Sequence, residues 1–131
     1  MSENYRLDRP TALTCPECGG ALARQQDSSL LQFRCHIGHV LTAETMLAAH
    51  FDVLETKLAA CLMALNERAE LCRELSKAAR AQGQDCGTYE AASAEAIERA
   101  KVIKNLLESE WTETVRAYAQ ESKGFAVRPR P

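Results

Sequence analysis

The stretch that decides the fold reads TCPECGG at residues 14–20 and, after a short gap, FRCHIGHV at residues 33–40. The first part carries a Cys-x2-Cys pair and the second a Cys-x3-His pair, and each pair lies beside a glycine. Two such pairs supply the four sulfur and nitrogen ligands of a closed tetrahedral zinc site. We predict one structural zinc ion, and its predicted ligands are Cys15, Cys18, Cys35 and His39.

The fourth ligand is the position that the pattern leaves open. His36 adjoins Cys35, and adjacent side chains do not readily face one ion, so His39 is favoured and His36 is expected on the surface of the turn. A redox pair is the other interpretation of Cys15 and Cys18, but redox CxxC pairs are typical of a βαβ context that this sequence does not show.

The residues between the two pairs predict a β-hairpin. Segments 21–24 and 30–34 alternate apolar and polar residues, and Asp27, Ser28 and Ser29 between them are typical of a turn. A hairpin with two ligand turns is a small zinc ribbon. Because four protein ligands leave the ion no open position, we expect it to contribute folding free energy rather than catalysis.

From Thr42, a suitable helix N-cap, the apolar period changes to steps of three and four residues. The series is Leu47, Phe51, Leu54, Leu58, Cys61, Leu65, Cys72, Leu75 and Ala79. It predicts a helix of about 40 residues, about 60 Å long, and only Arg68 breaks it. This length favours a coiled-coil partner.

The sequence GQDCGT at residues 83–88 predicts a stop, a turn and a new N-cap at Thr88. A second helix follows, antiparallel to the first because the turn is short. Its apolar series is Tyr89, Ser93, Ala96, Ala100, Ile103, Leu107 and Trp111. We expect Cys61 and Cys72 to be small buried hydrophobes, and Cys86 to be an exposed thiol in the turn.

These segments predict an α+β fold that is mostly α: a small zinc ribbon followed by a long antiparallel helical hairpin. The expected division is a flexible lead at 1–10, the ribbon at 11–41, the hairpin at 42–118 and a flexible tail at 119–131.

Charge and composition restrict the function. The 131 residues carry 16 basic and 18 acidic side chains, and the predicted ribbon has two of each, so it lacks the basic stripe that phosphate binding requires. A zinc-ribbon nucleic-acid-binding or transcriptional regulator is therefore the alternative, not the preferred interpretation. No secretory signal, apolar span or catalytic motif is evident, so we expect a cytoplasmic protein without membrane insertion that is not an enzyme.

The order TCPECGGAL, a short hairpin, LQFRCHIGHVLTAETML and a long Ala- and Leu-rich hairpin resembles the C-terminal module of some chemotaxis-type protein-glutamate methylesterases. The resemblance covers residues 11–110. In that pattern the CPxCGG and RC-x2-GH elements bind the metal and the slot between Cys35 and Gly38 varies, which implies that His36 is not a ligand.

Enzymes of that family carry a preceding catalytic domain with a Ser-His-Asp site. Only ten residues precede the ribbon here, so no methylesterase activity is expected. The resemblance implies an accessory or regulatory protein of a bacterial chemotaxis-like sensory signalling system. Such a protein would act by binding protein partners, among them signalling components, or by forming a homo-oligomer through the helical hairpin.

Overall fold

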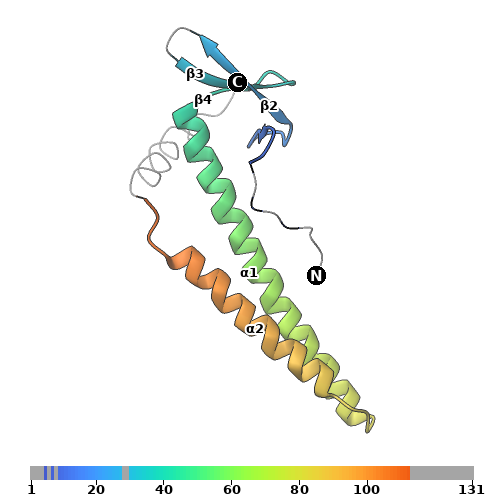
Figure 1. The fold of residues 1–131 in the computed structure, drawn as a ribbon. Coiled ribbons are helices and arrows are strands. Elements are labelled where there is room, and N and C mark those ends of the chain that lie inside the picture. The colour runs from blue at the N-terminus through green and yellow to red at the C-terminus, as the bar shows by residue number, and fades with distance from the viewer. Residues whose placement is uncertain (1–4, 6, 8, 28–29, 113–131) are drawn as a thin grey trace, which may run out of the picture. The chain divides into compact units, whose positions relative to one another are not determined.

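The computed structural model describes residues 5, 7, 9–27 and 30–112, and it consists of a four-stranded antiparallel sheet followed by two helices (Figure 1). The elements are β1 (Leu13–Thr14), β2 (Ala21–Asp27), β3 (Leu30–Cys35), β4 (Val40–Thr42), α1 (Ala43–Ala81) and α2 (Gly87–Glu108). The predicted fold class, α+β and mostly α with a helical hairpin, is confirmed. The predicted tail, most of the predicted lead, and the turn residues Ser28 and Ser29 lie outside the described residues.

The sheet is a meander in which each strand pairs with the next along the chain. Strands β2 and β3 form the predicted hairpin, with register from Leu22 opposite Cys35 to Asp27 opposite Leu30. Strand β2 continues three residues beyond its predicted end and includes Asp27, which was predicted to lie in the turn. Strands β1 and β4 were not predicted, because two or three residues are too few to show an alternating pattern. They extend the sheet on either side of the hairpin, so each predicted ligand pair lies at the junction of two strands.

The chain divides into two compact units. Among the described residues, the first unit holds the sheet and the start of α1 as far as Phe51, and the second is Asp52–Thr112. The first unit has a very small core, formed by Cys15, Leu22, Cys35, Leu41 and Met46. Two of these five buried residues are cysteines, so the core of the sheet is continuous with the predicted metal site.

Helix α1 begins and ends where the sequence predicts. Thr42 is its N-cap, and the Thr42 Oγ accepts a hydrogen bond from the backbone N–H of Thr45 at 3.2 Å. At the other end Gly83 has a φ of 69°, the left-handed conformation that glycine adopts most easily. The N–H groups of Gly83 and Gln84 donate to the carbonyls of Arg80 and Ala79 respectively, at 3.1 and 2.8 Å. This is a Schellman motif, which ends a helix and satisfies its last carbonyls.

The start of α2 differs from the prediction by two residues. The N-cap position is Cys86, not Thr88. The carboxylate of Asp85 accepts a hydrogen bond from the backbone N–H of Gly87 at 2.9 Å. Because this neighbouring side chain satisfies one of the first free N–H groups, the helix begins before Thr88 is reached.

The two helices of the second unit run antiparallel from the turn that joins them (Figure 1), and their buried residues are small. The buried positions are Ala69, Cys72, Ser76 and Ala79 on α1, and Ser93, Ala96 and Ala100 on α2. The Ser93 hydroxyl donates to the backbone carbonyl of Ala69 at 3.0 Å and so joins the helices directly. Small side chains at these positions let the two backbones approach closely.

The first apolar series is partly wrong. Leu47 is 43% exposed, Leu75 is 39% exposed and Cys61 is exposed, although the series placed all three on one apolar face of the helix. The buried seam continues from Ala69 in steps of three and four to Ser76, so Arg68 does not interrupt it. The buried residues here are small or polar, such as Ala69 and Ser76. A search for apolar periodicity selects the larger Leu75 instead, so the sequence pattern did not show the true seam.

Helix α2 also ends earlier than its apolar series. It ends at Glu108, and Ser109 turns to an extended backbone with ψ of 149°, so Trp111 lies beyond the helix. The Ser109 hydroxyl donates to the carbonyl of Asn105, one helical turn back. This side-chain bond competes with continuation of the backbone hydrogen bonds.

Candidate metal centre

The first ligand turn is a tight loop that follows β1. The backbone N–H of Cys15 donates to the carbonyl of Gly20 at 2.7 Å, and the N–H of Gly19 donates to the carbonyl of Cys15 at 2.9 Å. Gly19 has a φ of 75°, where a side chain would introduce strain. These bonds fold residues 15–20 back on themselves, so that Cys15 and Cys18 present their sulfur atoms from one short loop.

The second ligand turn joins β3 to β4 in a similar way. The N–H of Cys35 donates to the carbonyl of His39 at 3.1 Å, and the N–H of Gly38 donates to the carbonyl of Cys35 at 3.0 Å. Gly38 has a φ of 106°. The backbone N–H of His39 points at the Cys35 sulfur at 3.3 Å. The turn therefore presents one sulfur and one imidazole ring from a second short loop.

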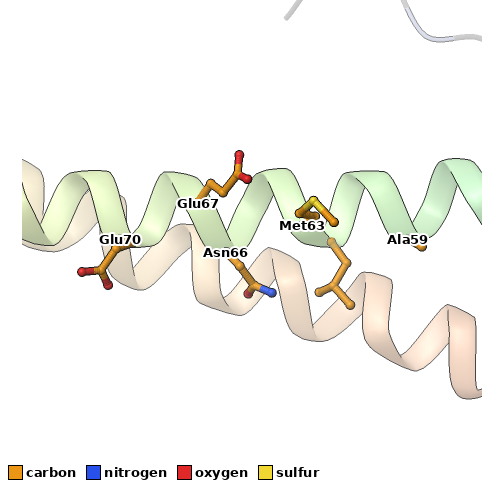
Figure 2. A pocket seen from close by; sticks show the side chains of 6 residues that line it. Ala59, Met63, Asn66, Glu67 and Glu70 are labelled. Carbon is orange, nitrogen blue, oxygen red and sulfur yellow. The ribbon is translucent and has the colours of Figure 1, made fainter.

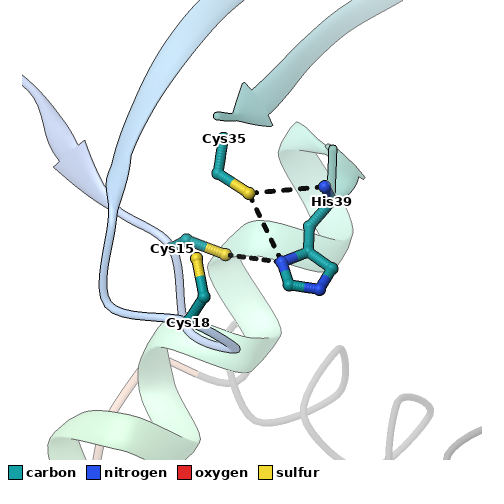
Figure 3. Close-up of side chains that lie close together, drawn as sticks. All are labelled: Cys15, Cys18, Cys35 and His39. Atoms are coloured by element: carbon teal, nitrogen blue, oxygen red, sulfur yellow. Dashed lines mark hydrogen bonds between the residues drawn. The ribbon is translucent and has the colours of Figure 1, made fainter. Parts of the chain in front are cut away.

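The two turns bring together the four side chains that the sequence singled out (Figure 3). One ligand atom from each of Cys15, Cys18, Cys35 and His39 lies within 4.8 Å of all the others. The Nδ1 atom of His39 lies 3.3 Å from the Cys35 sulfur and 3.7 Å from the Cys15 sulfur. Their role as ligands stays a prediction, but this part of the chain forms a cluster that could hold a metal ion.

The spacing of these atoms fits a tetrahedral ion. With metal–sulfur bonds of about 2.3 Å and metal–nitrogen bonds of about 2.0 Å, a regular tetrahedron places sulfur and nitrogen about 3.5 Å apart. The two measured sulfur–nitrogen distances of 3.3 and 3.7 Å lie on either side of this value. Cys15 and Cys35 are buried and Cys18 and His39 are partly buried, so the cluster is largely shielded from solvent.

The electrostatics of the cluster favour a cation. Burial raises the pKa of the Cys35 thiol, but backbone N–H groups at residues 37–39 point at its sulfur and, with Cys18, lower the pKa to about 6. The N–H of Gly20 acts to lower the pKa of Cys18, but burial and the sulfur atoms of Cys15 and Cys35 raise it overall. Hydrogen bonds to Cys15 and Cys35 raise the pKa of His39. The lowered pKa favours the thiolate form of Cys35, and a thiolate is the form that binds a metal cation.

Two further residues shape the site. The Nε2 atom of His39 lies 3.2 Å from Oε2 of Glu17, which belongs to the first ligand turn. The His36 ring lies against Gly20. A Cβ atom added at Gly20 would be 2.7 Å from the Cε1 atom of His36, so a larger residue there would clash with the ring. His36 is exposed and is not part of the four-atom cluster, and the helical residue His50 is exposed as well.

Sequence reasoning missed Glu17. The only signal in the sequence was an acidic residue between two predicted ligands, and ligand spacing does not show which side chain will contact the second nitrogen of a histidine.

Cys86 also differs from its prediction, because it is half-buried rather than exposed. The Arg80 guanidinium donates to its sulfur at 3.6 Å, and the Cys86 thiol donates to Glu90 at 3.4 Å.

The fold and site define an α+β protein with a Cys3His cluster at one end of a meander sheet. No protein-family model, curated protein or solved structure matches the chain. Within the described residues, neither helix combines the length and the apolar character needed to cross a membrane.

Proposed function

We propose that the chain is a zinc-binding protein of the cytoplasm that acts by binding other proteins and not by catalysis. The observation that supports this proposal most strongly is the cluster of three sulfurs and one nitrogen within 4.8 Å. Thiolate and imidazole ligands suit Zn²⁺, whereas Mg²⁺ and Ca²⁺ prefer oxygen. Four protein ligands complete the tetrahedron, so one zinc ion would be structural and closed to substrate.

The zinc ion would stabilise a sheet whose own core is small. Among the described residues, five form the buried core cluster of the first unit, and two of them are predicted ligands. A core of this size contributes little hydrophobic free energy. Zinc binding and folding of the sheet are therefore coupled in our proposal, and the ion holds the two ligand turns as one rigid surface.

The second unit offers an apolar surface for a protein partner. Six α1 residues line an open hollow on its side, namely Ala59, Leu62, Met63, Asn66, Glu67 and Glu70 (Figure 2). Met63 is 63% exposed, and Leu71 and Val102 are exposed to a similar extent. Large exposed apolar side chains on a helical hairpin suit an amphipathic helix of a partner or a second copy of the chain. We propose a protein partner as the main occupant.

The sensory context of the proposal rests on the sequence resemblance to the module of chemotaxis-type methylesterases. The partner would then be a component of a bacterial chemotaxis-like signalling system, and the chain would be its accessory or regulatory protein. The described part of the helices carries more acidic than basic residues, which suits a protein partner better than a nucleic acid.

The test is affinity purification of the zinc-loaded chain from its own cells at moderate salt, with partners identified by mass spectrometry. We expect chemoreceptors, histidine kinases or response regulators, and we expect a Met63→Glu variant to lose them. Ala64→Glu is the matched control, because Ala64 is exposed on the same helix outside the hollow. RNA polymerase, ribosomes or nucleic acid among the captured partners would contradict the proposal. So would a chain that captures no signalling protein and is monomeric in light scattering.

A further inference from the structure

Both ring nitrogens of His39 have a defined neighbour. The Nδ1 atom faces the sulfur atoms of Cys35 and Cys15 at 3.3 and 3.7 Å (Figure 3). The Nε2 atom, on the other side of the ring, lies 3.2 Å from the carboxylate of Glu17. Because the two nitrogens point in different directions, the ring has one edge toward the cluster and one toward a carboxylate.

A neutral imidazole carries one proton, and its position decides which nitrogen can bind a metal. A carboxylate accepts hydrogen bonds and cannot donate one when it is ionised. The proton of a neutral His39 therefore belongs on Nε2, opposite Glu17, and the Nδ1 lone pair then points at the sulfur atoms.

We propose that Glu17 is a positioning residue that holds His39 with its proton on Nε2 and its Nδ1 atom directed at the zinc ion. This inference rests on the proposed zinc site and adds the atom that binds and the residue that orients it. Carboxylates that accept a hydrogen bond from a ligating histidine fix the orientation of the ring and make the other nitrogen a stronger ligand.

The position of Glu17 gives this contact a second role. Glu17 lies between Cys15 and Cys18 in the first ligand turn, whereas His39 ends the second. The Glu17–His39 contact therefore joins the two turns outside the cluster itself. The backbone bonds of the first turn restrict the loop that carries Glu17, and the two side chains are only 32% and 27% exposed. A restrained, partly enclosed contact orients a ring better than a mobile surface pair does.

The direct test is long-range hydrogen–nitrogen correlation spectroscopy of the histidine rings in the zinc-loaded full chain. The proposal expects His39 to have a metal-bound Nδ1 and a protonated Nε2. A general loss of stability would not move this signature. Coordination through Nε2 would overturn the inference and leave the proposed zinc site intact.

Zinc affinity supplies the second readout, measured by competition with a chromophoric chelator. Glu17→Ala is expected to weaken zinc binding by about 10–100-fold, the usual effect of removing such a partner. Glu17→Gln should weaken it less, because its amide oxygen still accepts a hydrogen bond. Glu55→Ala, an exposed carboxylate on α1, is the matched control and should bind as the unchanged chain does.

The outcomes separate the two proposals. If the unchanged chain binds zinc tightly and Glu17→Ala binds it within about twofold of that affinity, the role of Glu17 is wrong and the zinc site stands. A role in folding alone is the interpretation if Glu17→Ala and Glu17→Gln weaken zinc binding equally, and this too would overturn the inference. If the unchanged chain binds no zinc, the proposed function fails and the inference fails with it.

Discussion

Enlarging one alanine in the hairpin interface should destabilise the second unit strongly. Ala96 is 2% exposed and lies on the face of α2 that also buries Ser93 and Ala100. The facing positions on α1 are small as well, and Ala69 is also 2% exposed. Ala96→Leu adds three carbon atoms at a place where neither helix has space for them. The helices must then separate or the side chain must adopt a strained rotamer.

The magnitude follows from known costs of overpacking. Adding methylene groups to a packed interior costs about 1–3 kcal/mol. For a unit of the size of Asp52–Thr112, each kcal/mol lowers Tm by about 4–8 °C. Ala96→Leu should therefore lower Tm by roughly 4–24 °C. The assay is thermal unfolding followed by circular dichroism at 222 nm, which reports the helices.

The control is Ala94→Leu, which makes the same chemical change two residues away on the same helix. Ala94 is exposed, so the added carbons meet solvent and the small difference in helix propensity is the only expected effect. Equal melting temperatures for the two variants would refute the reasoning, because they would mean that Ala96 is not enclosed between two closely packed helices.

Three other predictions concern the cysteines, the metal and the second ligand turn. Alkylation of the zinc-loaded chain should modify exposed Cys61 and half-buried Cys86 first, and the three predicted ligand cysteines should react only after a chelator removes the zinc. Mass spectrometry of the digested chain locates the modified cysteines, and a ligand cysteine modified before chelation would contradict this prediction. Removing zinc, or replacing Cys18 by Ser, should unfold the sheet while the circular dichroism signal of the helices stays mostly unchanged. Loss of the whole helical signal would show that the two units fold as one. Gly38→Ala places a side chain at a φ of 106°, and the resulting strain should cost about 1–2 kcal/mol of folding free energy. Because zinc binding and folding are coupled, zinc affinity measured by chelator competition should fall about tenfold, and an unchanged affinity would contradict this prediction.

The sequence was sufficient to predict the candidate ligands and the ends of α1, because the residue types at these positions favour one local structure. A Cys-x2-Cys pair and a Cys-x3-His pair with glycines beside them predicted two turns that meet, and the structure brings these four side chains together. Thr42 and Gly83 likewise marked the two ends of α1, because hydroxyl N-caps and left-handed glycines satisfy the free backbone groups of helix ends.

The hairpin interface was harder to predict because its seam is made of small residues. Ser76 and Ala69 are buried, while Leu75 beside them is 39% exposed. A hydrophobicity pattern assigns the larger side chain to the interface, whereas close packing of two helices selects the smaller one. Burial of Ser93 is possible because its hydroxyl donates to a carbonyl of the other helix, and only a tertiary structure shows that partner.

The neighbours of the candidate ligands could not be derived from spacing either. The contact of Glu17 with the outer nitrogen of His39 depends on how the two ligand turns face each other. That arrangement follows from β1 and β4, two strands too short to leave a pattern in the sequence. Spacing therefore predicted the ligand types, and the folded sheet was needed to find the residue that orients one of them.

The central claim is a closed zinc site formed by four side chains, and the most direct test is the metal content of the purified chain by native mass spectrometry. We expect one zinc ion per chain, retained on dialysis and in a Cys61→Ser variant, and lost in a Cys18→Ser variant. A folded chain that holds no metal, or a Cys18→Ser variant that keeps its zinc, would contradict the account.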